Sequence, residues 1–324
     1  MMQVLVTGAA GNLGKSLVVA LTAKGYRVRA VDCVAGPLTP GIEWARCDVT
    51  DLESLSTTMA GCEAVIHLAA LGLPWLASEE EVFRVNDYGS FCVFRAAAES
   101  GVRRIVAASS INAVGMYFGM RRVTVDRIPM TEESPCVTSD IYSFSKQIQE
   151  DIAKYFYRRS GITSLSLRMG ENMRIDPQPA TPAIRDTVVQ LLDLPRDEGR
   201  RRAREMVERF FARSSDLRCR YNEDYIANML ATGVTHLWTA LDCRDRDEAF
   251  ALALEADIEG AEVINVADAH NTLGIDAREL ASLFYPEAEI DANLRGTQSL
   301  WSIERARTLL GFVPKYSVAR YFSE

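Results

Sequence analysis

The chain has 324 residues, which is enough for one large α/β domain and a smaller second one. Its hydrophobic fraction of 48% is ordinary for a globular protein, and its net charge of −8 argues against a nucleic-acid binder. No apolar stretch approaches the roughly 20 residues of a membrane span, and the three histidines are too far apart to indicate a metal site. Seven cysteines without paired short spacings suit a reducing compartment, so we expect a cytoplasmic protein.

A glycine-rich turn follows the first expected strand, which covers residues 2–6. Residues 7–14 read TGAAGNLG, and an apolar helix pattern begins at residue 17. In such a strand–turn–helix unit the first glycine permits a tight turn and the second lets a pyrophosphate approach the backbone. The third allows close packing of the helix on the strand. The sequence therefore predicts a dinucleotide site whose phosphate-facing residues are Gly8, Ala10, Gly11, Asn12, Leu13 and Gly14.

The second expected strand, residues 26–31, ends on Asp32. In dinucleotide-binding folds an acidic residue about 20 positions after the glycines meets the adenosine ribose. A carboxylate there accepts hydrogen bonds from a free 2′-hydroxyl and repels a 2′-phosphate, so NAD is favoured over NADP. The alternative is that Asp32 only starts the next turn.

Strand and helix patterns then alternate as far as residue 167. Apolar strands separated by helices are typical of a parallel, doubly wound Rossmann-type sheet. The expected strands cover residues 43–46, 64–68, 104–108 and 163–167, and the expected helices cover residues 52–59, 79–100 and 141–159.

The pattern changes after Arg168, where three prolines interrupt it. We expect two helical pieces within residues 183–220, a helix over 242–255, a strand over 262–266, and short helices over 276–284 and 302–310. Residues 1–170 are predicted to form an NAD-binding domain to which residues 238–266 return. Residues 171–237 and 267–324 would form a smaller substrate-binding domain. The arginine-rich stretch 185–220 is either a diphosphate clamp or a solvated, ion-paired helix face.

Hydroxyl and amine side chains follow the expected strand 104–108. Ser109 and Ser110 come directly after it, and Tyr142 and Lys146 lie four residues apart on one face of the next helix. A tyrosine phenol, with an ordinary pKa of about 10, becomes a usable base when an ammonium group and a positive nicotinamide ring favour its phenolate. The pattern thus indicates that Tyr142 takes the proton of an alcohol while hydride leaves for the nicotinamide. The alternative is an exposed amphipathic pair.

These segments, together with CDVTD (47–51), HLAA (67–70) and YSFSK (142–146), resemble the extended short-chain dehydrogenases/reductases of the NAD-dependent epimerase/dehydratase family. The resemblance covers residues 1 to about 170. It implies a catalytic trio of Ser110, Tyr142 and Lys146, with Ser109 as the alternate serine, and a homodimer formed through the helices at 79–100 and 141–159. Asn86 would lie behind the nicotinamide, or else only cap or pack its helix. The other implied cofactor contacts are Asp48, Val49, Leu68, Ala69 and Ala70.

The departures from the family pattern bear on the reaction. No acidic residue follows Ser110, which disfavours dehydration, and the Val-Tyr-Gly of nucleotide-sugar epimerases is absent. The loop that begins with Ser-Ser is more similar to that of uronate dehydrogenases. Candidate substrate contacts are Ser109, Ile111, Asn112, Glu171, Asn172 and Arg174.

We therefore expect an NAD-dependent oxidoreductase that acts on a carbinol or carbonyl of a sugar, sugar acid or related small molecule. The alternative is a nucleotide-sugar epimerase that uses the same trio. A non-catalytic NAD-binding regulator is a third possibility, and the intact trio argues against it. No metal, nucleic acid or membrane is expected to take part.

Overall fold

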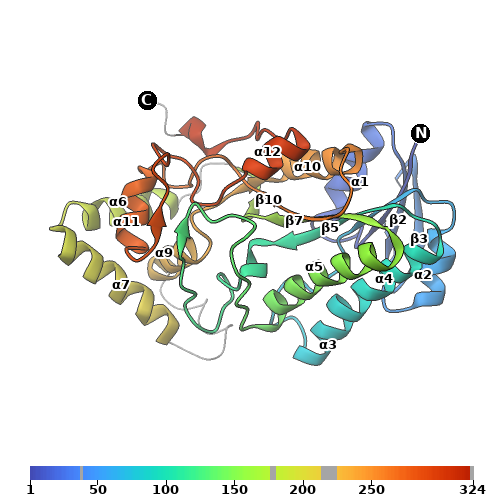
Figure 1. The fold of residues 1–324 in the computed structure, drawn as a ribbon, viewed down its shortest axis with the longest axis horizontal. Helices are drawn as coiled ribbons and strands as arrows, with labels where there is room; N and C mark the ends of the chain where they lie inside the picture. Colours follow the sequence, from blue (N-terminus) through green and yellow to red (C-terminus); the bar gives the residue numbers. More distant parts are fainter. Residues whose placement is uncertain (37–38, 176–179, 213–224, 322–324) are drawn as a thin grey trace.

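A seven-stranded parallel sheet forms the centre of the molecule (Figure 1), with strand order β10-β7-β5-β4-β1-β2-β3. The structure is a computed structural model and describes residues 1–36, 39–175, 180–212 and 225–321. From β1 the chain adds β2 and β3 on one side, and from β4 it adds the later strands on the other side. The boundary between β1 and β4 is therefore the switch point at which such sheets bind ligands. The predicted Rossmann-type fold is confirmed. The strands are β1 (Gln3–Thr7), β2 (Arg27–Asp32), β3 (Ile42–Arg46), β4 (Ala64–His67), β5 (Arg104–Ser110), β7 (Thr163–Met169) and β10 (Ala261–Val266).

Helices cover both faces of this sheet (Figure 1). One face carries α1 (Gly14–Ala23), α10 (Cys243–Glu255) and α12 (Glu304–Leu310). The other carries α2 (Leu52–Met59), α3 (Glu79–Phe83), α4 (Gly89–Glu99) and α5 (Ile141–Ser160). No helix in these described ranges is long and apolar enough to cross a membrane.

The two faces of the sheet belong to separate hydrophobic cores. Val4 on β1 joins a core that includes Leu17 of α1, whereas its neighbour Leu5 packs with Phe94 of α4 and Phe156 of α5. This division follows from strand geometry, because successive side chains point to opposite faces. A strand buried on both faces therefore reads as the continuous apolar run from which β1 was predicted.

The helix expected over residues 79–100 is not continuous. It consists of α3, a π-helical turn over Arg84–Tyr88, and α4. The turn buries two consecutive polar residues, Asn86 and Asp87, each 3% exposed. A π turn adds about one residue to a helical turn, and the same amino-acid types occur in it as in an α-helix. The hydrophobic periodicity of the sequence therefore could not show it.

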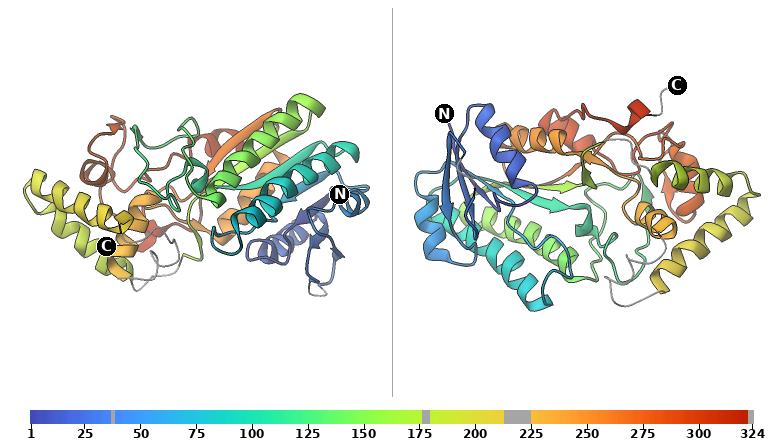
Figure 2. Two further views of the ribbon diagram at one scale, coloured as in Figure 1. Left: turned by 90° about the horizontal axis from the view of Figure 1, so that it is seen from below. Right: turned by 180° about the vertical axis from the view of Figure 1, so that it is seen from behind.

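The second half of the chain adds a group of helices beyond one end of the sheet. Figure 2 shows α6 (Ala180–Leu192) and α7 (Arg196–Ala212) at the opposite end of the molecule from the N-terminus. These are the two helical pieces expected over residues 183–220, of which 213–220 lie outside the described residues. The group also contains α9 (Tyr225–Thr235), α11 (Ala277–Phe284) and the paired strands β8 (Asn172–Met173) and β9 (Leu241–Asp242). From the first half of the chain, β6 (Arg127–Ile128) pairs with β11 (Glu289–Ile290), and 3₁₀ turns cover Ile111–Val114 and Val318–Tyr321.

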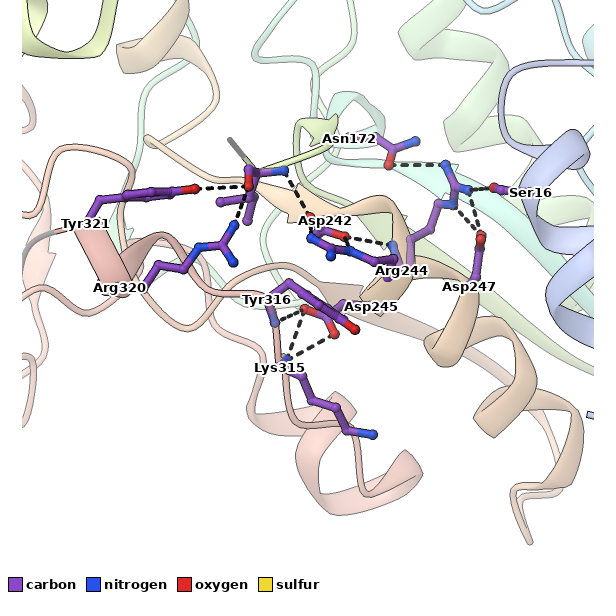
Figure 3. Close-up of polar contacts among 12 residues, drawn as sticks. Ser16, Asn172, Asp242, Arg244, Asp245, Asp247, Lys315, Tyr316, Arg320 and Tyr321 are labelled. Carbon is purple, nitrogen blue, oxygen red and sulfur yellow. Dashed lines mark hydrogen bonds and ion pairs between the residues drawn. The ribbon is translucent and has the colours of Figure 1, made fainter. Parts of the chain in front are cut away.

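The C-terminal segment is fixed to α10 by polar contacts (Figure 3). The carboxylate of Asp245, 2% exposed, accepts hydrogen bonds from the backbone amides of Lys315 and Tyr316 at 2.8–3.0 Å. The Arg244 guanidinium lies 3.4 Å from the ring centre of Tyr316 and also binds the carboxylate of Asp242, the N-cap of α10. Although β10 pairs with β7 in the main sheet, the division into two domains stays a prediction.

Candidate active site

The glycine-rich turn closes tightly against the loop that follows β4. Gly8 has a φ of +66°, and a Cβ atom there would lie 2.6 Å from the backbone nitrogen of Ala69. A Cβ atom on Gly14 would lie 2.4 Å from the carbonyl oxygen of Gly8. Leu13, which precedes α1, offers no capping side chain, so the amides of the first helical turn face the position of a bound anion. Only glycine fits at Gly8 and Gly14, and this close approach of backbone segments is what a dinucleotide pyrophosphate site needs.

Asp32 lies at the carboxyl end of β2, directly beside this turn. One carboxylate oxygen accepts a hydrogen bond from the amide of Ala10 at 3.0 Å, and the other accepts from the amide of Val34 at 3.3 Å. Asp32 therefore does start the next turn. A carboxylate has about four acceptor positions, so these two bonds leave capacity for a ribose hydroxyl.

The other predicted cofactor contacts lie around the same strand ends. Asp48 binds the amide of Thr50 at 2.9 Å, which holds the pKa of Asp48 below its ordinary value. The amides of Leu68 and Ala69 donate to the hydroxyl of Thr7 at 3.2 and 3.3 Å. These contacts hold the loop after β4, which continues through Ala70, against the glycine turn.

Asn86 joins that loop to helix α5. Its side-chain oxygen accepts from the amide of Leu71 at 2.8 Å, and its side-chain nitrogen donates to the hydroxyl of Ser145 at 3.0 Å. Ser145 stands between Tyr142 and Lys146 in the chain. Asn86 thus packs behind the predicted catalytic residues and fixes the helix that carries them.

The predicted trio comes together at the carboxyl end of β5. Asp140 caps α5 by accepting from the amide of Ser143 at 2.9 Å, which places Tyr142 in the first turn of the helix. The hydroxyl of Ser110 lies beside the phenol of Tyr142 and acts to lower the pKa of that phenol. The Lys146 amino group lies 5.8 Å from the centre of the Tyr142 ring and donates to the carbonyl of Ala108 at 2.8 Å.

The prediction that the Lys146 ammonium and a nicotinamide ring together lower the pKa of Tyr142 stays a prediction, and burial acts in the opposite direction. Burial raises the pKa of Tyr142 to about 12, although the Ser110 hydrogen bond opposes the rise. Burial also lowers the pKa of Lys146 to about 8, against the opposing effect of the Asp87 and Glu150 carboxylates. The groups of the protein alone therefore favour the neutral phenol of Tyr142 at neutral pH.

Ser109 and Ser110 have different surroundings, since neighbouring residues of a strand point to opposite faces. The hydroxyl of Ser109, 1% exposed, donates to the carboxylate of Glu150 at 2.7 Å. Glu150 in turn receives two hydrogen bonds of 2.8 Å from Arg168. Ser109 is thus held in a buried polar cluster and does not face Tyr142, so the geometry favours Ser110 as the catalytic serine.

The predicted substrate contacts divide into two groups. Ile111 and Asn112 are buried beside Ser110, and the side-chain oxygen of Asn112 has no hydrogen-bond partner among the described residues. Asn172 instead accepts from Arg246 at 3.3 Å. Arg246 also donates to the hydroxyl of Ser16 on α1, so it links Asn172 to the helix that follows the glycine turn. Arg174 is exposed.

Glu171 has a partner that sequence reasoning missed. Its carboxylate lies 3.1 Å from the Nε2 atom of His236, which is 4% exposed. Burial works to raise the pKa of Glu171, but His236 outweighs it and holds this pKa below the ordinary value. No sequence signal joins the two residues, because they lie 65 positions apart and only the fold brings them together.

A row of aromatic rings leads from Tyr142 to this polar pair. The centre of the Phe118 ring lies 5.7 Å from that of Tyr142 and 4.5 Å from that of Tyr117. Tyr117 meets His236 edge-on at 5.5 Å. The aromatic row Tyr142–Phe118–Tyr117–His236 therefore connects the catalytic phenol with the polar pair Glu171–His236.

Comparison with known proteins agrees with this geometry. The model of the NAD dependent epimerase/dehydratase family matches residues 4–173. Over 201 residues the chain is 33% identical to uronate dehydrogenase of Pseudomonas putida, covering 59% of this chain and 70% of the relative. It is 31% identical over 179 residues to the L-arabinose 1-dehydrogenase (NAD(P)(+)) of Haloferax volcanii, covering 52% and 67%.

Solved structures agree on the fold. The structure of uronate dehydrogenase from Agrobacterium tumefaciens superposes with a TM-score of 0.64 at 19% identity, covering 99% of this chain and 87% of that one. The predictions of an NAD cofactor and of an oxidoreductase of the extended short-chain dehydrogenase/reductase type are confirmed. On the family match and these relatives, the chain belongs to the NAD dependent epimerase/dehydratase family.

Proposed function

We propose that this protein is an NAD-dependent dehydrogenase that oxidises a carbinol of a sugar or sugar acid, with Tyr142 as the base. The contact between Ser110 and Tyr142, with Lys146 beside it, carries the proposal. This group lies at the carboxyl end of β5, at the same edge of the sheet as the glycine turn that follows β1. Dinucleotide-dependent catalysis requires this arrangement. The uronate and arabinose dehydrogenases among its relatives support a sugar or sugar acid as substrate.

Each residue of the trio has a definite task in this reaction. Bound NAD supplies a hydride acceptor and a positively charged ring. Tyr142 in its phenolate form accepts the proton of the substrate hydroxyl, and Ser110 donates a hydrogen bond to the same oxygen. Lys146 would donate a hydrogen bond to the nicotinamide ribose and would favour the phenolate by its charge. Because burial raises the pKa of Tyr142, the positive charges of Lys146 and of a bound nicotinamide ring would both be needed to favour the phenolate in this proposal.

The surroundings of Tyr142 suit a sugar. The aromatic row gives flat apolar surfaces with polar tips, and the side-chain oxygen of Asn112 is an unused acceptor among the described residues. Glu171 and His236 together offer both a carboxylate and an imidazole to hydroxyl groups. We propose that Ile111, Asn112 and Glu171 line the substrate side, whereas Ser109 and Asn172 act structurally.

The test is the formation of NADH in separate mixtures of the protein and NAD with uronates, neutral sugars, polyols and nucleotide-sugars. NADH absorbance should grow with a uronate or a neutral sugar, and the Tyr142→Phe protein should form none while still binding NAD. Absence of NADH in every mixture would overturn the proposal.

Epimerisation of a nucleotide-sugar is the second candidate, because the same trio can oxidise and then reduce a substrate. A diphosphate clamp in the arginine-rich stretch would have favoured it. In the described part of that stretch, however, the α7 arginines 201 and 202 are exposed and paired with Glu198 at 2.6–2.8 Å. Arg200 donates to the carbonyl of Ser282 at 2.9 Å. This is the arrangement of an ion-paired helix face.

We further propose that the protein is a homodimer through α3–α4 and α5. Large apolar side chains are exposed on this face, with Phe83 at 44%, Tyr88 at 49%, Phe144 at 39% and Tyr155 at 43%. Exposed large apolar side chains gathered on neighbouring helices are a feature of interaction surfaces. A monomeric mass in solution at micromolar concentration would contradict it. The cytoplasmic location stays a prediction from cysteine usage.

A further inference from the structure

Asp87 is a buried acid to which neither the family resemblance nor the proposed reaction gives a task. It lies on the π turn between α3 and α4 and is 3% exposed. Neither carboxylate oxygen has a hydrogen-bond partner in the described part of the chain. A carboxylate buried without partners is unfavourable and rare, so a compensating charge or a functional reason is to be expected.

The π turn places Asp87 against the catalytic helix. Asn86 on the turn is bonded to Ser145 on α5 at 3.0 Å, and the next residues along the two segments are Asp87 and Lys146. Lys146 is itself 5% exposed, and its ammonium has three donors. Its contacts are the carbonyl of Ala108 at 2.8 Å and the side-chain oxygen of Gln149 at 3.3 Å, both of which are neutral acceptors.

Lys146 is the cation whose charge stabilises the Asp87 carboxylate, and Asp87 is the first of two acids that stabilise the Lys146 ammonium. The second acid, Glu150, already receives two hydrogen bonds from Arg168 and one from Ser109. Its charge is therefore largely balanced.

The other titratable groups around the π turn do not compete for this role. His67 is buried between the hydroxyls of Thr7 and Ser90, and burial lowers its pKa to about 3, so it is neutral. Arg84, at the start of the turn, binds Glu81 at the surface at 2.8 Å. Of the groups around the π turn, Lys146 is thus the cation that compensates the buried carboxylate of Asp87.

We propose that Asp87 is the counterion that keeps Lys146 protonated, and is in this sense a positioning residue for the Ser110–Tyr142–Lys146 site. The inference rests on the proposed function in one respect, namely that Lys146 is the lysine that acts beside Tyr142. Burial alone would favour the neutral amine of Lys146. A neutral amine cannot favour the Tyr142 phenolate. The charge of Asp87 therefore acts on Tyr142 indirectly, by keeping Lys146 in its ammonium form.

A direct titration tests this without any substrate. The chain has only five lysines, so protein labelled with ¹³C at lysine Cε gives few signals, and Lys146→Arg identifies the one from Lys146. In Asp87→Asn the titration midpoint of Lys146 should fall by about one pH unit or more, as expected when an adjacent opposite charge is removed. A midpoint that stays in place would overturn the proposal.

The matched control is Asp151→Asn. Asp151 is an exposed acid on α5, the helix that carries Lys146, and it binds Lys154 at 3.0 Å. This substitution should leave the Lys146 midpoint where it is. Asp87→Ala removes the same charge without introducing a buried amide, and should give the same shift as Asp87→Asn. If only one of the two variants moves the midpoint, the effect comes from packing and the proposal is wrong.

The second readout is NAD affinity and, where turnover is found, kcat/KM as functions of pH. In Asp87→Asn both should match the wild type at low pH and decline at a lower pH than in the wild type, since the ammonium is lost earlier. A uniform loss at every pH would indicate a structural role and contradict the proposal. If no sugar is oxidised by the wild type, the proposed function fails, while the lysine titration still decides the role of Asp87.

Discussion

Replacing Asp87 with asparagine should stabilise the fold far more at pH 8 than at pH 5. Burial raises the pKa of Asp87 from 3.8 to about 7, and the charge of Lys146 only partly offsets the rise. The folded protein therefore binds this proton more tightly than the unfolded chain does. It follows that stability of the wild type decreases as pH rises from about 4 to about 7.

The magnitude comes from the shift itself. A shift of about three units corresponds to about 4 kcal/mol of destabilisation once pH exceeds 7, at 1.36 kcal/mol per unit. The two units that lie above pH 5 account for about 3 kcal/mol of it. Asparagine has no proton to lose, so the variant escapes this pH-dependent destabilisation.

The assay is urea denaturation of wild type and Asp87→Asn at pH 5 and pH 8, followed by the fluorescence of the four tryptophans. The difference in unfolding free energy between the two proteins should change by about 3 kcal/mol between these pH values, in favour of the variant at pH 8. Any effect of the amide on packing is the same at both pH values and cancels. A difference that stays constant within about 1 kcal/mol would refute the reasoning, because it would mean that Asp87 is not a strained buried acid.

Three further outcomes follow from the site. Tyr142→Phe should lower kcat by about 10²–10⁴-fold and leave the Kd for NAD within a few-fold, as measured by steady-state kinetics and titration calorimetry. Near-normal turnover would show that Tyr142 is not the catalytic base. Glu150→Gln should lower the unfolding free energy by about 3–5 kcal/mol, since it leaves Arg168 buried without its partner, and a loss below about 1 kcal/mol in urea melts would contradict this. Asp32→Gly should reduce the ratio of kcat/KM for NAD to that for NADP, and an unchanged ratio would show that Asp32 does not select the cofactor.

Much of the fold could be predicted because buried parallel strands leave a strong signal. Each long strand of the sheet is an apolar run between helices, and the turn at residues 7–14 has two positions, Gly8 and Gly14, where a Cβ atom would clash. The four two-residue strands were missed, since a pair of residues has no periodicity. The π turn was missed for a related reason, because helix-compatible residues run through it without interruption.

Candidate site residues could be predicted where spacing or a strand end marks them. Tyr142 and Lys146 share one helix face, so their spacing made them candidates. Alternation along β5 separates Ser109 from Ser110, but which of the two faces Tyr142 depends on Glu150 and Arg168, far along the chain. The Glu171–His236 pair and the burial of Asp87 are products of tertiary packing and could not be found from the sequence.

The central claim is that the protein transfers a hydride from a sugar carbinol to NAD. The most direct measurement uses a uronate that carries deuterium on the oxidised carbon, with NAD in excess, and determines the mass of the nicotinamide product. The account predicts one deuterium in each NADH formed, and none formed by Tyr142→Phe. If no labelled NADH appears while a nucleotide-sugar is converted to an isomer, the protein is an epimerase and the claim is wrong.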